Sequence, residues 1–263
     1  MSETVWRLSV FASALILFSL LEALFPRRRR NLPRQGRWLT HLGITVIDSL
    51  VVRILGPLTA IAVAIWAANK GIGLFNLTQW PLWLEIVLAF ILLDCAIYWQ
   101  HVISHRVPFF WRFHKVHHTD RDLDASSAVR FHPVEILLSM LYKCGVVLII
   151  GPAALAVLIF EIVLNASAIF NHANLKLPLG VDKILRLFIV TPDMHRVHHS
   201  VIETETNRNF GFNLSVWDRL FRSYKAQPEG GHDGMTIGLS EHQSEAPSQL
   251  FWSLKLPFAK SLK

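Results

Sequence analysis

Residues 101–118 read HVISHRVPFFWRFHKVHH and follow directly on a long apolar run. This stretch contains five histidines, which are His101, His105, His114, His117 and His118. In a helix the first two would stand one turn apart on one face, and the last three would share a face through spacings of three and four residues. Within each set the imidazole rings are therefore expected to converge on a point.

A second histidine triplet follows about eighty residues later, at His195, His198 and His199. It repeats the His-x-x-His-His spacing of residues 114–118, with a basic residue and a valine between the histidines. We interpret the two triplets as two matching half-sites. Neutral imidazole is the commonest nitrogen ligand for zinc, copper, iron and nickel, so the pattern predicts a metal site.

The composition of the 263-residue chain is that of a membrane protein. Hydrophobic residues make up 52% of it, charged residues only 17%, and the mean hydropathy is +0.38, which is not typical of a soluble protein. The formal charge of +7 comes from basic residues clustered beside apolar segments. This placement indicates a topology signal and no nucleic-acid partner. The two cysteines, Cys95 and Cys144, lie inside apolar runs, and we expect them to be reduced and buried.

Apolar spans or half-spans occur at residues 5–25, 40–68, 83–100, 134–150 and 152–170. The second is interrupted at Gly56-Pro57, which should kink or break a helix. The last two are separated by Gly151-Pro152 and together are long enough for a helical hairpin, with a single kinked helix as the alternative. We predict an all-α integral membrane fold with about four transmembrane helices, one of them kinked or broken, and a histidine-rich helical cap.

The distribution of basic residues predicts the orientation of these spans. The loop after the first span contains Arg27–Arg30, Arg34 and Arg37, whereas the loop 69–82 contains one lysine and no arginine. By the positive-inside rule the first loop is cytoplasmic and the second is external. The basic segment 101–132 is then cytoplasmic as well. An active site there would lie on the cytoplasmic face, of a bacterial inner membrane rather than of the endoplasmic reticulum.

We expect residues 1–263 to form a single membrane-embedded domain. Residues 101–132 and 171–240 contain the clustered histidines and are predicted to form a cytoplasmic metal-binding cap. The tail, residues 241–263, mixes aromatic, apolar and lysine side chains, as an interfacial helix does.

His172, in the sequence Phe170-Asn171-His172, is a natural ninth member of the clustered histidines. Nine imidazoles exceed what one zinc ion or one octahedral ion binds, whereas they suit two ions that share a site. The residues alone therefore predict an all-nitrogen binuclear centre at a membrane face. Iron or copper with dioxygen and hydrolysis by zinc are both compatible with it.

Three further residues near the histidines are candidates for an indirect role. Asp94 and Asp193 could each accept a hydrogen bond from the second ring nitrogen of a metal-bound imidazole. His132 precedes Pro133, which predicts a helix N-cap, and either a ligand or a supporting role stays open for it. The isolated histidines are expected at the surface and tolerant of substitution; they are His41, His232 and His242.

The motifs around the histidines resemble the sterol desaturase and fatty acid hydroxylase superfamily over roughly residues 85–240. The resemblance rests on Asp94–His105, His114–His118, Arg130–Glu135, Phe170–Leu175, Thr191–Ser200 and Asn209–Phe221. It implies an integral membrane, non-haem di-iron oxygenase that hydroxylates or desaturates an unactivated C–H bond of a lipid, such as a sterol or a fatty acyl chain. By the same resemblance the nine histidines are the iron ligands. Lys176 stands where some relatives have a further histidine.

The resemblance also implies the cofactor and the partners. Such enzymes use two iron ions, dioxygen and two electrons from an external donor, and zinc can replace iron in overexpressed protein. The lipid would enter from the bilayer. A ferredoxin-, rubredoxin- or cytochrome b5-like protein would supply the electrons, because the sequence has no recognisable electron-transfer module. The alternatives are a zinc-dependent membrane hydrolase, with Asp94 or Asp193 as the base, and a non-catalytic metal-binding or transport protein.

Overall fold

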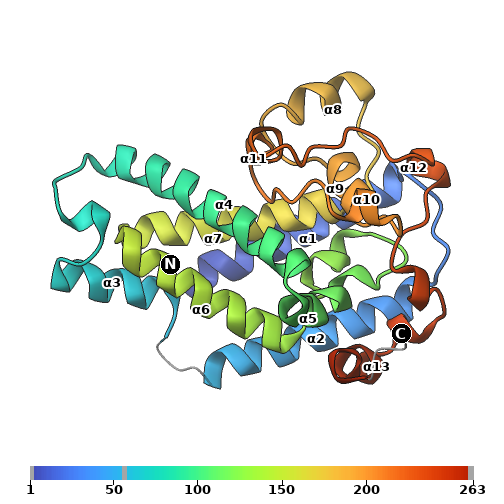
Figure 1. Cartoon of the computed structure of the whole chain (residues 1–263), viewed down its shortest axis with the longest axis horizontal. Helices are drawn as coiled ribbons and strands as arrows, with labels where there is room; N and C mark the ends of the chain where they lie inside the picture. Colours follow the sequence, from blue (N-terminus) through green and yellow to red (C-terminus); the bar gives the residue numbers. More distant parts are fainter. Residues whose placement is uncertain (1–2, 55–57, 260–263) are drawn as a thin grey trace.

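The computed structural model describes residues 3–54 and 58–259, which form helices, loops and isolated bridges without a β-strand. The long helices lie roughly along the long axis of the molecule, and most of the short helices gather at one end of it (Figure 1). We call that end the cap. The chain is all-helical, as the hydropathy pattern predicts.

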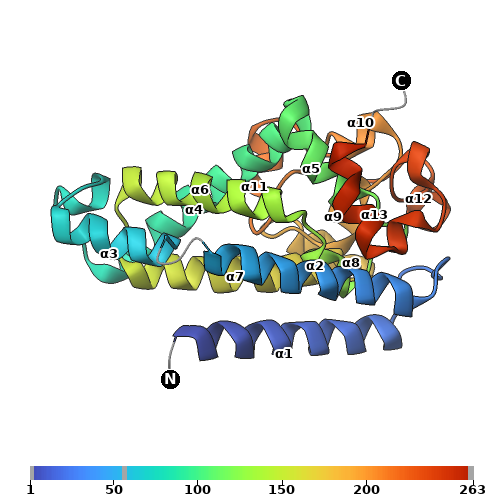
Figure 2. The same cartoon turned by 90° about the horizontal axis from the view of Figure 1, so that it is seen from below.

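Four helices are long and apolar enough to cross a membrane. They are α1 (Glu3–Leu24), α4 (Leu82–Arg106), α6 (Pro133–Ile150) and α7 (Ala154–His172). A helix needs roughly 20 apolar residues to span the hydrocarbon core of a bilayer, and each of the four meets that requirement. The predicted all-α membrane fold with about four spanning helices is confirmed. α1 runs along the outside of the bundle (Figure 2), where it packs on α7.

The predicted span 40–68 is wrong in its extent, because two separate helices occupy this part of the chain. α2 (Arg34–Ile54) begins in the cap, and α3 (Ala60–Lys70) has only 11 residues, too few to cross a membrane alone. α2 buries polar and charged side chains along one face, so it is amphipathic and not uniformly apolar. The predicted break at Gly56-Pro57 lies outside the described residues.

The apolar run after residue 133 forms a helical hairpin, which excludes the single kinked helix. α6 and α7 run in opposite directions between the cap and the far end of the bundle (Figure 1). Gly151 ends α6 with a φ of 60°, a conformation that favours glycine. A Cβ atom at Gly73, in the loop between α3 and α4, would lie 2.4 Å from the Cα atom of Gly151. The two turns can therefore pack only because both residues lack side chains.

The remaining elements are short. The α-helices are α5 (Pro108–His118), α8 (Leu179–Leu185), α9 (Pro192–His198), α10 (Glu203–Thr206), α11 (Val216–Leu220), α12 (Gly231–Gly234) and α13 (Leu250–Lys255). The 3-10 turns are η1 (Leu74–Asn76), η2 (Ala125–Val129), η3 (Ser240–His242), η4 (Ala246–Ser248) and η5 (Leu256–Phe258). In the tail, α13 packs on α2, while the side chains of Phe251 and Phe258 stay exposed.

Buried ion pairs connect the helix ends at the cap. The guanidinium of Arg37, on α2, is 1% exposed and donates hydrogen bonds of 2.7 Å to the carboxylates of Asp120 and Asp124. The carboxylate of Glu22, at the end of α1, accepts a 3.0 Å hydrogen bond from the backbone N–H of Asn174. Glu22 is fully buried, although an acidic residue at the end of an apolar run can usually reach the membrane interface. Removing one member of such a pair leaves a buried charge unpaired, so these contacts hold the cap segments firmly to the helices.

Candidate metal centre

α4 carries the first two histidines into the cap. His101 and His105 lie one turn apart near its C-terminal end, with ring centroids 5.1 Å apart. Asp94 and Tyr98 are buried on the same helix, at the positions that share this face. The shared face predicted for His101 and His105 is therefore present, and it continues along the helix to Asp94.

Both histidine triplets lie at the C-terminal ends of short helices that begin with a proline, Pro108 in α5 and Pro192 in α9. Proline suits the first position of a helix because its backbone lacks an N–H and its φ is already helical. Thr191 caps α9 by accepting a hydrogen bond from the backbone N–H of Met194. These local signals set where each triplet stands on its helix.

The two triplets do not form two separate half-sites, which corrects the interpretation from the spacing. His114 and His118 belong to one cluster, whereas His117, between them in sequence, belongs to another. The second triplet divides in the same way, because residues four apart share a helix face and the residue three along is rotated away from it. Each cluster thus takes a pair from one triplet and a single histidine from the other.

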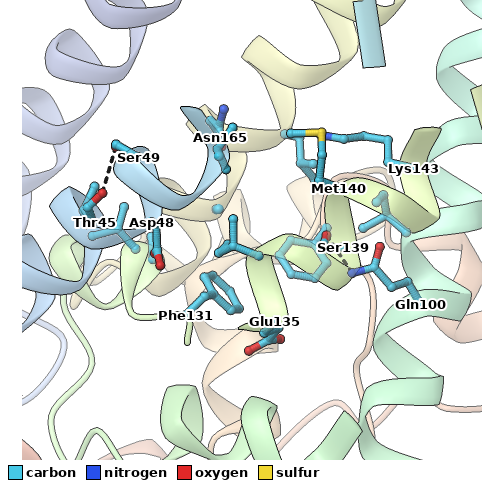
Figure 3. A pocket seen from close by; sticks show the side chains of 18 of the residues that line it. Thr45, Asp48, Ser49, Gln100, Phe131, Glu135, Ser139, Met140, Lys143 and Asn165 are labelled. Carbon is cyan, nitrogen blue, oxygen red and sulfur yellow. Dashed lines mark hydrogen bonds between the residues drawn. The ribbon is translucent and has the colours of Figure 1, made fainter. Parts of the chain in front are cut away.

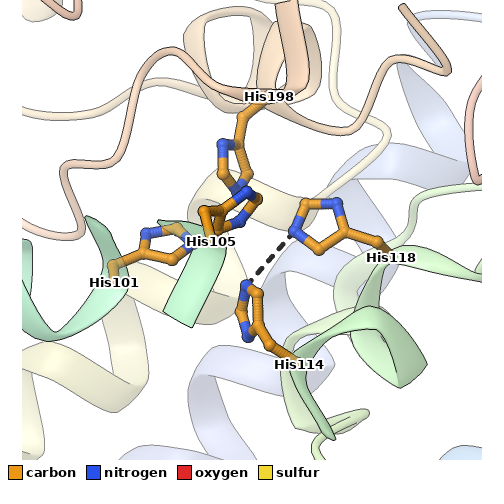
Figure 4. A group of neighbouring side chains, drawn as sticks. All are labelled: His101, His105, His114, His118 and His198. Atoms are coloured by element: carbon orange, nitrogen blue, oxygen red, sulfur yellow. Dashed lines mark hydrogen bonds between the residues drawn. The ribbon is translucent and has the colours of Figure 1, made fainter. Parts of the chain in front are cut away.

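The nine clustered histidines form two groups whose candidate ligand atoms lie within 4.8 Å of one another. The cavity-side group consists of His101, His105, His114, His118 and His198 (Figure 4). The enclosed group consists of His117, His172, His195 and His199. The groups adjoin, because the rings of His118 and His199 stack with centroids 4.6 Å apart.

Hydrogen bonds at Nδ1 orient four of these rings, three of them through backbone carbonyl groups. The Nδ1 atoms of His101 and His198 each lie 2.8 Å from a backbone carbonyl oxygen, that of Phe210 and that of Arg208. His172 Nδ1 lies 2.7 Å from the carbonyl oxygen of its own helix at position 168. A carbonyl oxygen only accepts, so Nδ1 donates in each case and Nε2 keeps its lone pair.

His114 is oriented by a side chain instead. Its Nδ1 lies 2.5 Å from Oε1 of Glu135, near the start of α6. A carboxylate on the second nitrogen fixes the tautomer of a ligand imidazole and raises its basicity. The Nε2 lone pair of His114 is thereby directed into the cavity-side group.

The Nε2 atoms have almost nothing to bind except one another. Those of His101, His105 and His198 are buried without a hydrogen-bond partner among the described residues. In the enclosed group, His172 Nε2 lies 3.0 Å from His117 Nε2 and 3.1 Å from His195 Nε2. Unsatisfied buried nitrogens are costly. A metal ion at each group would satisfy them, so the donor set fits two ions.

Burial keeps the imidazoles in the form that binds metals. It lowers the pKa of His118 and His199 well below the usual value, and neighbouring imidazoles lower it further. Burial likewise lowers the pKa of His198 to about 3. These rings are neutral at physiological pH, which is the state that a metal requires.

A cavity of about 610 Å³ lies between α2, α4 and α6 and reaches His101 and His114. Within the described part of the chain, no member of the enclosed group lines it. Its wall is mainly apolar, with side chains such as Ile97 and Phe131, and includes a smaller set of polar groups. This combination is typical of a small-molecule site. The cavity therefore connects one histidine group, and not the other, with space for a ligand.

Comparison with known proteins matches the region that contains the histidines to a protein family. The model of the fatty acid hydroxylase family matches residues 86–223, which is more than half of the chain and contains all nine clustered histidines. The chain belongs to the fatty acid hydroxylase family. The superfamily predicted from the motifs is confirmed. No solved structure matches the chain.

Three curated relatives illustrate the range of this family. The chain is 26% identical over 229 residues to the ornithine lipid hydroxylase OlsE of Rhizobium tropici, covering 85% of this chain and 68% of that protein. It is 30% identical to human alkylglycerol monooxygenase over 56% of this chain, and 23% identical to rat cholesterol 25-hydroxylase over 55%. The matched stretches span only 32% and 48% of those two proteins. The names support the predicted enzyme class, an oxidoreductase that acts on lipids.

Two carboxylates have other partners than the histidine rings expected for them. Asp94 accepts hydrogen bonds of 2.8 Å from the Asn213 amide and the Trp217 indole, and so holds the segment before and within α11 against α4. Asp193 pairs with Arg27 and Arg196. The described contacts of both carboxylates are thus with cations, amides and an indole, and not with one of the nine clustered histidines.

His132 is the predicted helix N-cap and stands outside both histidine groups. Its Nδ1 accepts a hydrogen bond from the backbone N–H of Val134, and its Nε2 lies 3.2 Å from the carbonyl oxygen of Leu254. Both ring nitrogens are therefore occupied by backbone groups. The structure favours a role in joining α6 to the tail over the ligand role that the sequence left open.

The surface positions expected for two isolated histidines are wrong. His41 is fully buried, with Nδ1 2.8 Å from the hydroxyl of Ser126, because α2 packs on η2. His232 is 4% exposed and its Nε2 lies 3.6 Å from a carboxylate oxygen of Asp193. His242 is partly exposed, with its ring edge-on to Trp252.

Sequence reasoning missed the groups that orient the rings. Glu135 was visible only as an acidic residue in the first turn of a helix that begins with Pro133, a common position for a carboxylate. The carbonyl groups of Phe210 and Arg208 have no signature in the sequence, since every residue has a carbonyl. Only the folded chain shows which of them meet a histidine.

Proposed function

We propose that this protein is a membrane-embedded monooxygenase that hydroxylates a C–H bond of a lipid with dioxygen and two electrons from an external donor. The observation that carries the proposal is the cavity that ends at His101 and His114, beside a set of nine clustered histidines of which eight are buried. The relatives' names, hydroxylase and monooxygenase, favour hydroxylation over desaturation. One oxygen atom would enter the product, and the other would leave as water with two protons.

The nine histidines would hold two iron ions, one at each group. Iron bound there would supply the oxidising chemistry that a C–H bond of a lipid requires. Iron binds less tightly than zinc in the usual order, so overexpressed protein can contain zinc instead. Metal analysis after growth with added iron tests the assignment. Two ions per chain are expected, and at most one ion of any metal would refute a binuclear centre.

The chain's own residues would position the substrate and keep the site dry. The apolar wall, including Ile97 and Phe131, would hold an acyl or alkyl chain and exclude water. Glu135 would hold the Nδ1 proton of His114, so that this imidazole keeps its orientation at the inner end of the cavity. The substrate would enter from the bilayer, because the four apolar helices α1, α4, α6 and α7 all contribute residues to the cavity wall.

Zinc-dependent hydrolysis is the weaker candidate. It usually requires a carboxylate base beside the reacting water. The two carboxylates considered for that role, Asp94 and Asp193, are engaged with an amide and an indole and with two arginines. Within the described part of the chain Glu135 keeps its Oε2 free at the cavity, so what favours the oxygenase over the hydrolase is the names of the relatives, which are hydroxylases and monooxygenases.

The direct test is the product. Cells that carry the wild-type chain and cells that carry His198→Ala would be grown in isotopically labelled dioxygen, and their lipids compared by mass spectrometry. A hydroxylated lipid with labelled oxygen is expected only with the wild type. Absence of any labelled lipid, with membrane-inserted protein and a bacterial reductant present, would contradict the function.

We place the active site on the cytoplasmic face, where a ferredoxin-, rubredoxin- or cytochrome b5-like protein could deliver electrons. Two observations support this placement. The basic stretch Arg27–Arg30 lies beside the cap, whereas the loop 69–82, which contains one lysine and no arginine, lies at the opposite end of the helical bundle (Figure 1). A cysteine introduced at Gln35 should react with a membrane-permeant reagent and resist an impermeant one in intact cells. Labelling from outside would reverse the orientation.

A further inference from the structure

The cavity beside the histidines has a polar side whose hydrogen-bonding capacity is not used. Asp48 comes from α2, Gln100 from α4 and Glu135 from α6, and all three line it. Figure 3 shows Asp48 and Gln100 on opposite sides of the view, with Phe131 and Glu135 between them. Three helices thus direct polar groups into one space.

Asp48 is the least satisfied of these groups. Its side chain is 9% exposed, and its Oδ1 is buried without a hydrogen-bond partner among the described residues. Within the same residues no ion pair reaches its carboxylate. A buried carboxylate without a partner is strongly disfavoured, so Asp48 is mainly protonated at neutral pH until a cation beside it stabilises the ionised form. Burial, and next the carboxylate of Glu135, raise the pKa of Asp48 to about 8.

Two more acceptors face the same space. Glu135 uses Oε1 on His114, whereas its Oε2 is buried without a partner in the described part of the chain. Gln100 donates through its amide nitrogen to Ser139, and its Oε1 is likewise without a donor there. The wall therefore presents three oxygen acceptors, two of them on carboxylates.

The nearby cations do not compensate these carboxylates. Arg7 and Lys143 line the cavity, but both pair with Glu161 on α7, and Arg7 also pairs with Glu3. Arg53, the other lining cation, is exposed at the end of α2. A positive charge brought by the ligand would stabilise both carboxylates at once.

From this geometry we infer that the substrate of the proposed hydroxylation is a lipid whose head group carries a primary ammonium, held by Asp48 on the wall that Glu135 shares. An ammonium group offers three N–H donors and no acceptor. It therefore matches a wall whose unpartnered side-chain oxygens can only gain from a donor, and its charge matches the carboxylates of Asp48 and Glu135. The inference rests on the proposed function for the reaction, but it concerns binding, which can be measured without turnover.

Binding to purified protein in lipid nanodiscs tests it with three probes that share one chain. Hexadecylamine carries the charge and the donors at neutral pH, hexadecanol has a hydroxyl without charge, and hexadecyltrimethylammonium has the charge without N–H donors. We expect hexadecylamine to bind at least about tenfold more tightly than either of the others, since a hydrogen bond to a charged group contributes that much or more.

Variants locate the preference. Asp48→Leu should remove it and leave the protein folded, because replacing an unpartnered buried carboxyl by an apolar group of similar size is not destabilising. Asp48→Asn keeps the shape and an acceptor, and should retain only part of the preference. Ser49→Ala is the matched control, because Ser49 lines the same cavity but its hydroxyl already donates to the Thr45 carbonyl at 2.8 Å. It should bind as the wild type does.

Three results would overturn the inference. They are equal binding of the amine and the alcohol, equal binding of the amine and its trimethyl analogue, and an amine preference that survives in a folded Asp48→Leu variant. Failure of the proposed function has a different signature, because a protein that hydroxylates no lipid could still show the amine preference. A hydroxylase that ignores the head group would produce labelled product with no preference among the probes.

Discussion

The cavity-side group and the enclosed group contain nearly the same donors in different surroundings. The cavity-side group meets open space at His101 and His114, and three of its rings are oriented by hydrogen bonds. In the enclosed group, one ring, that of His172, is oriented by such a bond. The carboxylates of Asp120 and Asp124, which Arg37 holds, are near enough to act electrostatically on His172.

This difference suggests a division of labour between two similar sites. A site that faces the substrate must hold its ligand rings in one orientation while the cavity fills and empties, and hydrogen bonds to Nδ1 do that. A site enclosed by protein can rely on packing and on the rigidity of the ion pairs behind it. The following substitutions would break or sharpen the comparison.

The largest effect should come from removing one ligand from each group. His118→Ala and His199→Ala remove rings that stack on each other across the boundary, yet each should cost one of the two ions, and activity should fall at least about a hundredfold. Metal content and product formation, both normalised to membrane-inserted protein, measure this. Loss of both ions from either variant would mean that the groups act as one site. His242→Ala is the control and should keep both ions and full activity.

The second largest effect should come from breaking the buried ion pairs of Arg37 with Asp120 and Asp124. Arg37→Met leaves two buried carboxylates without their cation, and we expect it to lower the free energy of unfolding by about 3–5 kcal/mol. Denaturant unfolding in detergent measures this loss of stability, and the yield of membrane-inserted protein gives a second readout. Arg29→Met, at an exposed position of the basic loop, should change stability little. Equal stability of the two variants would contradict the role of the network.

The third substitution tests whether the hydrogen bond to His114 matters for the cavity-side group alone. Glu135→Gln removes the charge that holds His114, and metal affinity at the cavity-side group should fall by about 10- to 100-fold while the enclosed group keeps its ion. Competition with a chelator, followed as two release steps, would resolve the sites. Glu241→Gln, on an exposed turn, serves as the control. A matching loss at both groups would remove the distinction between them.

The smallest effect is expected at the histidine outside both groups. His132→Ala removes the N-cap of α6 and should destabilise the protein by about 1 kcal/mol without changing its metal content. His132→Asn should restore most of that stability, since asparagine also caps helices. Thermal unfolding and metal analysis of the two variants check this. A lost ion in His132→Ala would return the residue to the ligand set.

Several features followed from the sequence because their causes are local. Runs of about twenty apolar residues predict membrane-spanning helices wherever they occur, and α1, α4, α6 and α7 are such runs. The spacing of His101 and His105 predicts one face of a helix, and a proline after His132 predicts an N-cap. The histidine triplets also led to the family, whose model matches the region that contains them.

The sequence misjudged residues whose state depends on distant partners. His41 and Glu22 resemble ordinary polar residues near the ends of apolar runs, but chain segments about eighty or more residues away bury them. Asp94 was expected to accept a hydrogen bond from a histidine, but it accepts from the Asn213 amide and the Trp217 indole, more than a hundred residues later in the chain. Burial and pairing of this kind are properties of contacts between elements, which no local pattern contains.

By itself the sequence determined that the chain is a helical membrane protein with nine clustered histidines, because hydropathy and helical periodicity act over one or two turns. Only the tertiary structure decided how those histidines divide. A helix rotates by about 100° per residue, so His117 and His118 must point in different directions. Which neighbours each of them meets depends on how α4, α5, α7 and α9 pack. The same packing placed the unpaired carboxylate of Asp48 on the wall of the cavity that reaches one group and not the other.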